Sequence, residues 1–599
     1  MSSMFHLLES HLFTLPWNSM SEAEQLKISY DRSRAIGRAF QFTMSDILHL
    51  TPKFWKFHRG NICALDICAF SLVTIQCNLV AGTLAPFVQD HPEHRLLLDQ
   101  ILNFDVNAQF LLTELGHGLD AKNLETTATL LEDGGFDLHT PHINAAKYMS
   151  PTSPVPGHPR IGLVIARLMV ADEDRGVRPF IVRINDGESM SPGIICKVLP
   201  RRAGSKMVDH STTTFNHVHL PKTSLLGSLK KPLNERDQFL SVISRISVGT
   251  LAISTTMIPI LKRCAFVAGK YSLRRQIKGP SGSQIPIISF RTQQGPILHA
   301  LANIAVFEAW ATDCTQRFCD MNLETRVRHG IATAFKAVLT RATQDTLYTL
   351  AERCGAQGLY EHNHIIESQL ESRGISISEG DTLTLCIRLA SELLLGRYKL
   401  PPPNYPECLL AQHETSLFDE CRAVLQNLST GHRSQEFNHA ILPKCQLLVE
   451  SAGQRMAYEA ALSASVPSEL LAIYEAGSIR QDPAWYVEKC GITHEKLFAM
   501  ECQALDAGLL SFDQLLDELD VEPYCTAPIL SETLMEDFNA RLRTYENKGE
   551  AKHSKDSIPQ SRFIPADQQG LAILEDRGTG NQLITGTMPA SQAFKGGFP

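Results

Sequence analysis

Apolar residues recur at every third or fourth position from Ile243 to Cys264, which is the spacing of one continuous helical face. That spacing requires a long helix buried along one side, which Pro259 is expected to kink. The same period returns in a helix that starts near Thr292, in a helix over 327–355 and in a helix over 382–398. Four long helices predict a four-helix bundle over residues 233–398.

Helical spacing also fills the two ends of the chain. Residues 1–107 show it, and Ser21-Glu22-Ala23-Glu24 opens a helical pattern that continues past Arg38. The prolines of "KLPPPNYP" indicate a linker, after which residues 399–545 are helical again. Residues 546–599 are polar and poor in aromatics, which is typical of a disordered tail. We therefore expect an N-terminal helical domain, a C-terminal helical domain and a disordered tail.

Residues 108–232 have a different texture. Ile161–Val170 is short, β-branched and apolar, the turn signal "DEDRG" follows, and Arg178–Ile184 reads as a second strand. Thr213–Leu220 alternates apolar and polar residues. We predict a central β-barrel-like domain, and so an α+β multidomain protein.

The totals limit the partners that the chain can have. The net charge is −8 and no basic block occurs, so nucleic acid is not an expected partner. Fifteen cysteines without a C-x-x-C pair, and a start that lacks a secretory signal, favour an intracellular protein. The nearest match to a membrane span is Leu65–Val88. It carries Asp66, Gln76 and Asn78, so we interpret it as a buried helix and expect no membrane span.

Two polar stretches stand out before any likeness is considered. "TELGHG" places Thr113-Glu114 and Gly116 directly after an apolar run, and taken alone it is a strand end followed by a turn. "EHNHIIES" brings His362, His364 and Glu367 close together in sequence. No other ligand cluster is evident, and we predict no metal site.

The sequence resembles the acyl-CoA oxidases, the flavin-dependent relatives of acyl-CoA dehydrogenases. The likeness is carried by "TELGHGLDAKNLETTATLLEDGGFDLHTP", "YSLRRQ", "ISFRTQQGPILHALA", "CGAQG" and "SEGDTLTLCIRLASELL". These five segments occur in the family's order over residues 30–545.

The resemblance implies FAD as cofactor. It implies that Thr113 hydrogen-bonds the isoalloxazine edge, with Gly116 shaping the turn beside it. Arg274 takes the position that reaches the flavin diphosphate across a dimer interface, and Gln294 takes a position that contacts the cofactor. Further family positions, in the turn that cradles the adenine half, are Gly355 and Gly358. Ala356 replaces a family glycine there, and its methyl group is expected to obstruct a positive φ.

The resemblance also places the catalytic base at Glu379, in "ISISEGDTLTL". A carboxylate in an apolar site is a strengthened base, able to take the weakly acidic α-proton of a thioester. We expect Ile377 and Leu383 to supply that apolar site and Gly380 to let the carboxylate approach the substrate. The alternative is an exposed loop glutamate followed by a helix cap at Asp381.

The implied reaction makes a trans-2-enoyl thioester from an acyl-CoA, with O₂ as the electron acceptor and hydrogen peroxide as product. A homodimer with shared cofactor sites is expected. "KYMSPTSPVPGH" stands where relatives carry K-W-W-P-G-G-L-G. That change motivates two alternatives, a family flavoenzyme with a carrier-bound or specialised substrate and a flavin-free scaffold of the same fold. The resemblance suggests the peroxisome, but the chain ends "KGGFP" without a peroxisomal signal, so the cytoplasm is the other expectation.

Overall fold

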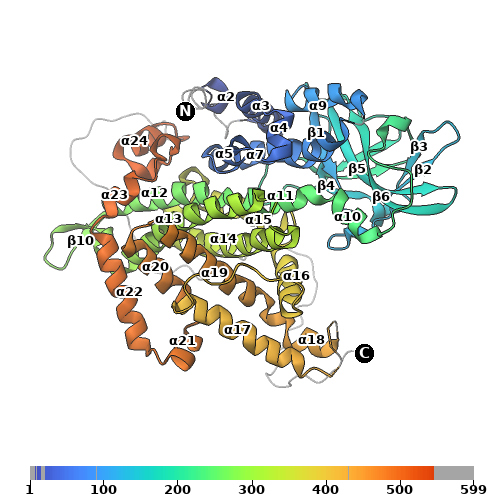
Figure 1. Cartoon of the computed structure of the whole chain (residues 1–599). Coiled ribbons are helices and arrows are strands. Elements are labelled where there is room, and N and C mark those ends of the chain that lie inside the picture. Colours follow the sequence, from blue (N-terminus) through green and yellow to red (C-terminus); the bar gives the residue numbers. More distant parts are fainter. Residues whose placement is uncertain are drawn as a thin grey trace, which may run out of the picture. The chain divides into compact units, whose positions relative to one another are not determined.

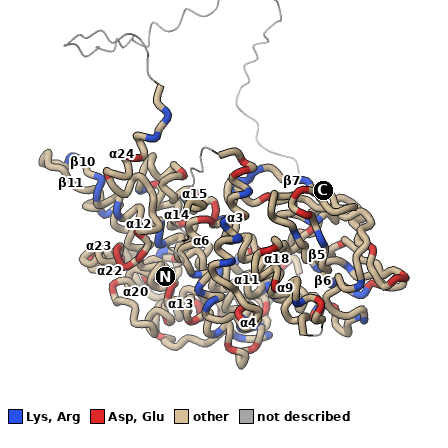
Figure 2. The backbone as a smooth tube through the Cα atoms, turned by 90° about the horizontal axis from the view of Figure 1, so that it is seen from above, with Lys and Arg blue, Asp and Glu red and all other residues tan. Residues whose placement is uncertain are grey.

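The computed structural model describes residues 7, 10–14, 20–89, 91–429, 431, 432 and 434–545. One compact unit ends at Arg541, and residues 542–545 begin a second. The predicted tail, 546–599, lies outside the described residues. The division into five domains stays a prediction. Lys and Arg residues are interspersed with Asp and Glu residues along the described backbone (Figure 2).

The N-terminal part is helical (Figure 1). A capping box begins its first long helix at the N-terminus. Ser21 N donates to Glu24 Oε2 over 2.8 Å, and the Ser21 hydroxyl accepts from Glu24 N over 3.3 Å. The helices are α2 (His11–Thr14), α3 (Glu22–Phe40), α4 (Met44–His49), α5 (Pro52–His58), α6 (Ile62–Leu65), α7 (Ile67–Thr74), the π-helix η2 (Ile75–Ala81), α8 (Gly82–Leu84) and α9 (Arg95–Leu102).

In the described residues, two helical stretches, Ile67–Phe87 and Ser244–Arg274, are long and apolar enough to cross a membrane. Most of each stretch is buried inside the protein, where a core helix has the same composition. Gln76 is fully buried within the first stretch. Its side-chain amide donates to Ile101 O and accepts from Ala108 N, so it joins this helix to the segment between α9 and β1.

The central part holds two sheets. Strand β5 lies in the middle of the larger sheet: β1 and then β2 pair with one of its edges in parallel, and β6 pairs with the other edge antiparallel. The smaller sheet has the order β4-β8-β7. The strands are β1 (Asn107–Leu111), β2 (Thr127–Leu130), β3 (Phe136–His139), β4 (Lys147–Pro151), β5 (Arg160–Val170), β6 (Glu173–Asn185), β7 (Ile194–Val198), β8 (His210–Phe215) and β9 (Val218–Leu220).

The predicted turn after β5 is displaced. "DEDRG" was expected to form it, but the turn is the pair Ala171-Asp172, with φ of 49° and 61°. Two consecutive positive φ values match the twist of an antiparallel hairpin, and Asp tolerates them better than most residues. Glu173 already belongs to β6.

The bundle is built around two long helices, α13 and α14, which lie side by side (Figure 1). The predicted stops at Cys354-Gly355 and the start near Thr292 are confirmed. The helices are α10 (Glu235–Val242), α11 (Ser244–Thr255), α12 (Met257–Arg274), α13 (Arg291–Cys319), α14 (Thr325–Arg353), α15 (Ile365–Ile377) and α16 (Thr382–Leu394). The short strands β10 (Gln276–Lys278) and β11 (Gln284–Pro286) form a hairpin between α12 and α13.

Two details of the bundle differ from the expectation. The first helix is not kinked but interrupted at Thr256, and Pro259 lies in the first turn of α12, where its missing N–H has no helical partner to lose. The sequence pattern also missed α15, which packs along α14.

The C-terminal helices close the bundle, because α19 and α20 both pack on α13. They are α17 (Leu409–Gln426), α18 (Gln435–Ala440), α19 (Cys445–Ser463), α20 (Ser468–Ile479), α21 (Pro483–Cys490), α22 (His494–Leu509), α23 (Phe512–Asp517) and α24 (Glu532–Ala540). The proline segment before them, 399–406, has no regular structure, as the three prolines predict.

Candidate active site

Glu379 lies in the tight loop between α15 and α16. Its φ is +56° and that of Gly380 is +93°. The left-handed region is costly for a residue with a side chain, by about 1–3 kcal/mol, and persists only where surrounding contacts impose it. The loop is followed at once by α16, whose N-terminus is capped by Asp381 through Thr384 N at 2.9 Å. The Asp381 cap, which the sequence analysis gave as part of the alternative to a catalytic glutamate, is therefore present.

Side chains from two bundle helices fix the loop backbone. Lys336 of α14 donates from Nζ to Ser378 O and to Gly380 O, each over 2.5 Å. Thr250 of α11 donates its hydroxyl to Glu379 O over 2.8 Å. Three consecutive carbonyl oxygens are thus held, and these contacts supply the restraint that the left-handed φ requires.

The Glu379 carboxylate packs directly against the backbone of α11 at Gly249. A Cβ atom at that position would lie 2.4 Å from Glu379 Cδ, so only glycine leaves room for the carboxylate. Burial raises the pKa of Glu379 to about 8, against the opposing charges of Lys336 and Arg245. Burial also lowers the pKa of Lys336 to about 8 and that of Arg245 to about 10.

Two residues expected to line this site do not do so. The side chains of Ile377 and Leu383 are 66% and 49% exposed. The chain reverses direction at Glu379-Gly380, so the neighbours in sequence face solvent while the glutamate faces α11. The enclosure comes from α11 and α14, more than forty residues away in sequence.

Thr113 and Gly116 lie in an excursion of the chain between β1 and β2. Both strands pair with β5, at Leu111↔Val164 and Thr127↔Arg167, so the residues between them leave the sheet edge. Thr113 O accepts from Tyr148 N over 2.9 Å. Within the described residues, no hydrogen bond of the Thr113 hydroxyl is recorded.

Gly116 serves the packing of this excursion rather than a positive φ. Its N–H donates to Asn144 O over 2.8 Å, and a Cβ atom would lie 3.0 Å from Asn144 Cβ. Glycine therefore favours the close approach of these two backbone segments.

The glutamate of "TELGHG" has a structural partner that the sequence analysis did not identify. Glu114 and Lys147 form a fully buried ion pair with 2.9 Å between Glu114 Oε1 and Lys147 Nζ. The carboxylate also accepts from the N–H groups of Glu125 and Thr126. Burial opposes its ionisation, but the Lys147 charge and these bonds hold the pKa of Glu114 below its ordinary value.

Helix α11 connects the Glu379 loop with the Thr113 segment. Leu112, the residue before Thr113, packs in one apolar cluster with Val242 and Ile246. Thr250 lies one turn beyond Ile246, and its hydroxyl donates both to Ile246 O and to Glu379 O. The two predicted parts of the site therefore adjoin the same helix in consecutive turns.

The other predicted cofactor residues gather at the opposite end of the bundle helices. Gln293 connects their segments, because its Nε2 donates to Ser272 Oγ over 2.8 Å and to Arg353 O over 2.9 Å. Gln294 is buried beside it. Arg274 ends α12 and donates from Nε and Nη2 to Ile529 O. Two of its five donor hydrogens are thereby used within the chain.

The "CGAQG" turn corrects one expectation. Gly355 has φ of +58°, but Ala356 does not have a positive φ, so its methyl group obstructs nothing of that kind. Gly358 is buried, and a Cβ atom there would lie 2.0 Å from Ala351 O. The second glycine is thus required by the way the turn folds back on α14.

The residues around Gln293, namely Arg274, Gln294 and Gly355, are here called the Gln293 group. They lie far from Glu379 within one chain. Arg353 follows Lys336 by seventeen positions on α14, which is about 25 Å at 1.5 Å per residue. The predicted site residues therefore form two groups, one at Glu379 and Thr113 and the other at Arg274, Gln294 and Gly355.

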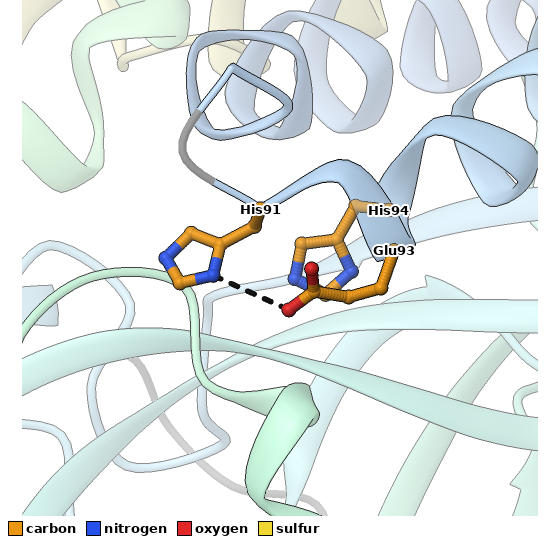
Figure 3. Close-up of side chains that lie close together, drawn as sticks. All are labelled: His91, Glu93 and His94. Atoms are coloured by element: carbon orange, nitrogen blue, oxygen red, sulfur yellow. Dashed lines mark hydrogen bonds and ion pairs between the residues drawn. The ribbon is translucent and has the colours of Figure 1, made fainter.

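The histidine-rich stretch does not converge on one point. His364 caps α15 and contacts Thr526 Oγ1 over 3.1 Å, whereas the ring of His362 lies 4.3 Å from that of Phe538. In the described part of the chain, one group of metal-binding side chains does come close together: His91, Glu93 and His94 on the turn before α9 (Figure 3). His91 Nδ1 lies 3.3 Å from Glu93 Oε1. None of these three residues belongs to either group of predicted site residues.

Gly249 and Lys336 were not found from the sequence. A glycine inside an apolar helix and a lysine inside the apolar run "AFKAV" break the helical pattern, and these breaks are the signals that the sequence offers. Only the fold reveals that both residues face the same loop.

Comparison with known proteins agrees with this architecture. A family profile described as the acyl-CoA oxidase, C-alpha1 domain, matches residues 246–394, which contain Gly249, Lys336 and Glu379. A putative peroxisomal acyl-coenzyme A oxidase 3.2 of Arabidopsis thaliana is 24% identical over 424 residues. The match covers 65% of this chain and 62% of that relative, so the chain spans less than two thirds of its length.

Solved structures extend the likeness to most of the chain. Acyl-CoA oxidase 1 of Yarrowia lipolytica superposes with a TM-score of 0.78 at 17% identity, covering 93% of this chain and 94% of that one. Acyl-CoA oxidase 2 of Caenorhabditis elegans, solved with FAD, ascaroside-CoA and ATP, gives a TM-score of 0.68 at 16% identity, covering 87% and 92%.

A β domain between helical parts, with a glutamate loop held against the bundle, defines a protein of the acyl-CoA oxidase fold. The family profile over the bundle and the similarity to the curated relatives agree with this fold.

Proposed function

We propose that this protein is an FAD-dependent oxidoreductase that introduces an α,β double bond into an acyl-CoA thioester. The observation that carries the proposal is the Glu379 carboxylate, packed on Gly249 and enclosed so that burial raises its pKa to about 8. A base with such a pKa is well matched to a weakly acidic proton near neutral pH.

In this mechanism Glu379 takes the proton from Cα of the thioester. The left-handed backbone and the three held carbonyls keep the carboxylate at one place, which limits the geometries that it can sample. The Gly249 backbone leaves the carboxylate in contact with α11 while the bundle excludes water from one side.

The Thr113 segment fits a flavin. The Thr113 hydroxyl has no recorded partner in the described residues and is available as a donor, and the buried Glu114–Lys147 pair holds the segment rigidly. FAD, when bound, supplies the acceptor for the hydride that leaves Cβ. The C. elegans relative with FAD supports this cofactor.

The Gln293 group supports a homodimer with shared cofactor sites. Arg274, Gln294 and Gly355 gather about 25 Å from the Glu379 group by helix length, so we propose that they serve the cofactor of a second copy. A guanidinium offers bidentate donors to a diphosphate, and three donor hydrogens of Arg274 lie outside its bond to Ile529 O.

We further propose O₂ as the electron acceptor, with hydrogen peroxide as product, and a peroxisomal location, because the Arabidopsis relative is named a peroxisomal oxidase. A second candidate function is oxidation of a different thioester. The irregular register between Tyr148 and Pro151 in β4, with Met149 at φ +68°, favours an altered pocket wall.

The test is an absorbance spectrum of the purified protein under anaerobic conditions, before and after a series of straight-chain acyl-CoA thioesters. We expect a flavin band that these thioesters bleach, and peroxide once air is admitted. Glu379→Gln is expected to keep the band and to bleach at least about 10²-fold more slowly. A colourless protein that does not take up FAD rejects the proposal. A yellow protein bleached only by branched or carrier-bound thioesters favours the second candidate.

A further inference from the structure

Lys336 makes an unusual set of contacts for a buried lysine. Its side chain is fully buried in the middle of α14, and both recorded hydrogen bonds of Nζ in the described structure go to peptide oxygens, Ser378 O and Gly380 O. Buried ammonium groups are normally paired with a carboxylate. Here the carboxylate closest in sequence to both acceptors, that of Glu379, lies against Gly249 instead.

The two acceptors are the peptide groups on either side of Glu379. One ammonium therefore spans the residue whose backbone is strained, and Thr250 holds the oxygen between them. Loss of the ammonium would leave two carbonyls without these donors and would release the left-handed φ of Glu379. The side chain would then be free to leave the contact with α11.

We propose that Lys336 is a positioning residue for proton abstraction: by binding the carbonyls on both sides of Glu379, its ammonium holds the carboxylate in the one place from which it reaches the substrate. This inference rests on the proposed function, because it takes Glu379 as the base. Lys336 acts through Glu379 and does not touch the reacting atoms.

The ammonium also acts through its charge. The charged groups that act on Glu379 are Lys336 from α14 and Arg245 from α11, and both lower the pKa that burial raises. Asp381, next along the loop, acts on Lys336 in turn. The donors of Arg245 bind Asn78 and Ile47 O in the N-terminal helices, so Arg245 contributes charge without holding the loop.

Two substitutions separate the bonds from the charge. Lys336→Met removes both, whereas Lys336→Gln removes the charge and keeps an NH₂ group that can donate to the loop carbonyls. The control is Thr343→Val, two turns further along α14. Thr343 is also fully buried, and its hydroxyl has no recorded partner in the described residues.

The measurement is the exchange of α-protons in D₂O with 3,3-dimethylbutyryl-CoA, followed by NMR from pH 6 to 10. This thioester carries α-protons but no β-hydrogen, so the assay reports the base alone and is independent of hydride transfer. The carboxylate takes one proton from Cα and returns a deuteron, and nothing is oxidised.

We expect Lys336→Met to lower the limiting exchange rate about 10- to 100-fold, because the carboxylate is no longer held. We also expect the acid limb, the rise of the rate with pH as Glu379 ionises, to move up by about one to two pH units, because a positive charge is lost. Lys336→Gln is expected to show the same shift of the acid limb but a limiting rate within a few-fold of the unaltered protein. Thr343→Val is expected to change neither quantity.

The outcomes separate the two proposals. If Glu379→Gln exchanges like the unaltered protein, Glu379 is not the base and the proposed function fails. If Glu379→Gln abolishes exchange while Lys336→Met and Lys336→Gln both keep the normal profile, the positioning role of Lys336 is overturned and the function stands. If Lys336→Met does not fold, Lys336→Leu replaces it, and a limiting exchange rate equal to that of the unaltered protein contradicts the proposal.

Discussion

In two places a buried lysine lies beside a glutamate, and the hydrogen bonds of the two lysines differ in kind. In the β domain, Lys147 bonds the Glu114 carboxylate directly, over 2.9 Å, and the pKa of Glu114 stays low. In the bundle, Lys336 bonds the peptide groups around Glu379, and the pKa of that carboxyl rises to about 8. Burial lowers the pKa of both lysines to about 8.

The difference lies in what the carboxylate is left to do. The Glu114 carboxylate accepts from one ammonium and two backbone N–H groups, so its oxygens are satisfied and its role is structural. Glu379 receives restraint on its backbone only, so its carboxylate keeps its capacity to accept a proton. A direct bond from an ammonium would fix the position of the carboxylate and would also lower its pKa, which weakens it as a base. A bond to the flanking carbonyls fixes the position without that direct bond.

The largest effect is expected when the direct pair is broken. Lys147→Met leaves Glu114 charged and buried, at a cost of about 3–5 kcal/mol in the free energy of unfolding, measured by urea denaturation. The double variant Lys147→Met with Glu114→Gln is expected to recover part of that loss, since no charge is then left unpaired. If the free energy of unfolding of Lys147→Met lies within about 1 kcal/mol of that of the unaltered protein, the ion pair does not have this structural role.

The sequence predicted most of the fold because its local signals were consistent. The helix start at Ser21 and the helix stop at Cys354-Gly355 each require only neighbouring residues. Failures occurred where a local pattern was weak: α15 has apolar residues on several sides, and the turn at Ala171-Asp172 lacks glycine.

The candidate site divides in the same way. The position of Glu379 came from a motif, but its surroundings could not, because Gly249 lies 130 residues before it and Ile377, the expected lining, faces solvent. Likewise Glu114 and Lys147 lie in separate segments of the sequence, and only the strand arrangement brings them together. Enclosure and pairing are properties of the fold.

The contact with α11 provides the second test of the comparison. Gly249→Ala places a methyl carbon where the Glu379 carboxylate now lies, 2.4 Å from Cδ in the present geometry. We expect the carboxylate to be displaced and kcat to fall at least about tenfold, with flavin content unchanged and a stability cost of about 1–3 kcal/mol. Gly374→Ala in α15 is the matched control, because no atom lies within 4 Å of its added Cβ. Equal rates in both variants would show that the carboxylate does not need this contact.

The pH dependence of the reaction separates the two glutamates directly. The base acts only when ionised, so kcat/KM is expected to rise with pH, about tenfold per unit, and to level off near pH 8, the raised pKa of Glu379. Glu114 is already ionised between pH 6 and pH 9, so it causes no change of kcat/KM with pH in this range. Steady-state rates between pH 6 and 9 measure the profile. A plateau that extends down to pH 6 would contradict an enclosed base.

A further effect is expected in the pH dependence of stability. A carboxyl with a pKa of about 8 in the folded state and an ordinary pKa in the unfolded state binds more protons when folded, between those two values. Stability therefore falls as pH rises through that window, by at most about 1.4 kcal/mol per pH unit for one proton. Glu379→Gln removes this slope, so its unfolding free energy relative to the unaltered protein is expected to increase from pH 5 to pH 7.5. Glu114→Gln is expected to show no such change between pH 5 and pH 7.5, because the pKa of Glu114 is lowered in the folded state and the carboxyl is ionised in both states over this window. If the two variants respond to pH alike in urea denaturation, the two pairs do not differ in the way that their hydrogen bonds indicate.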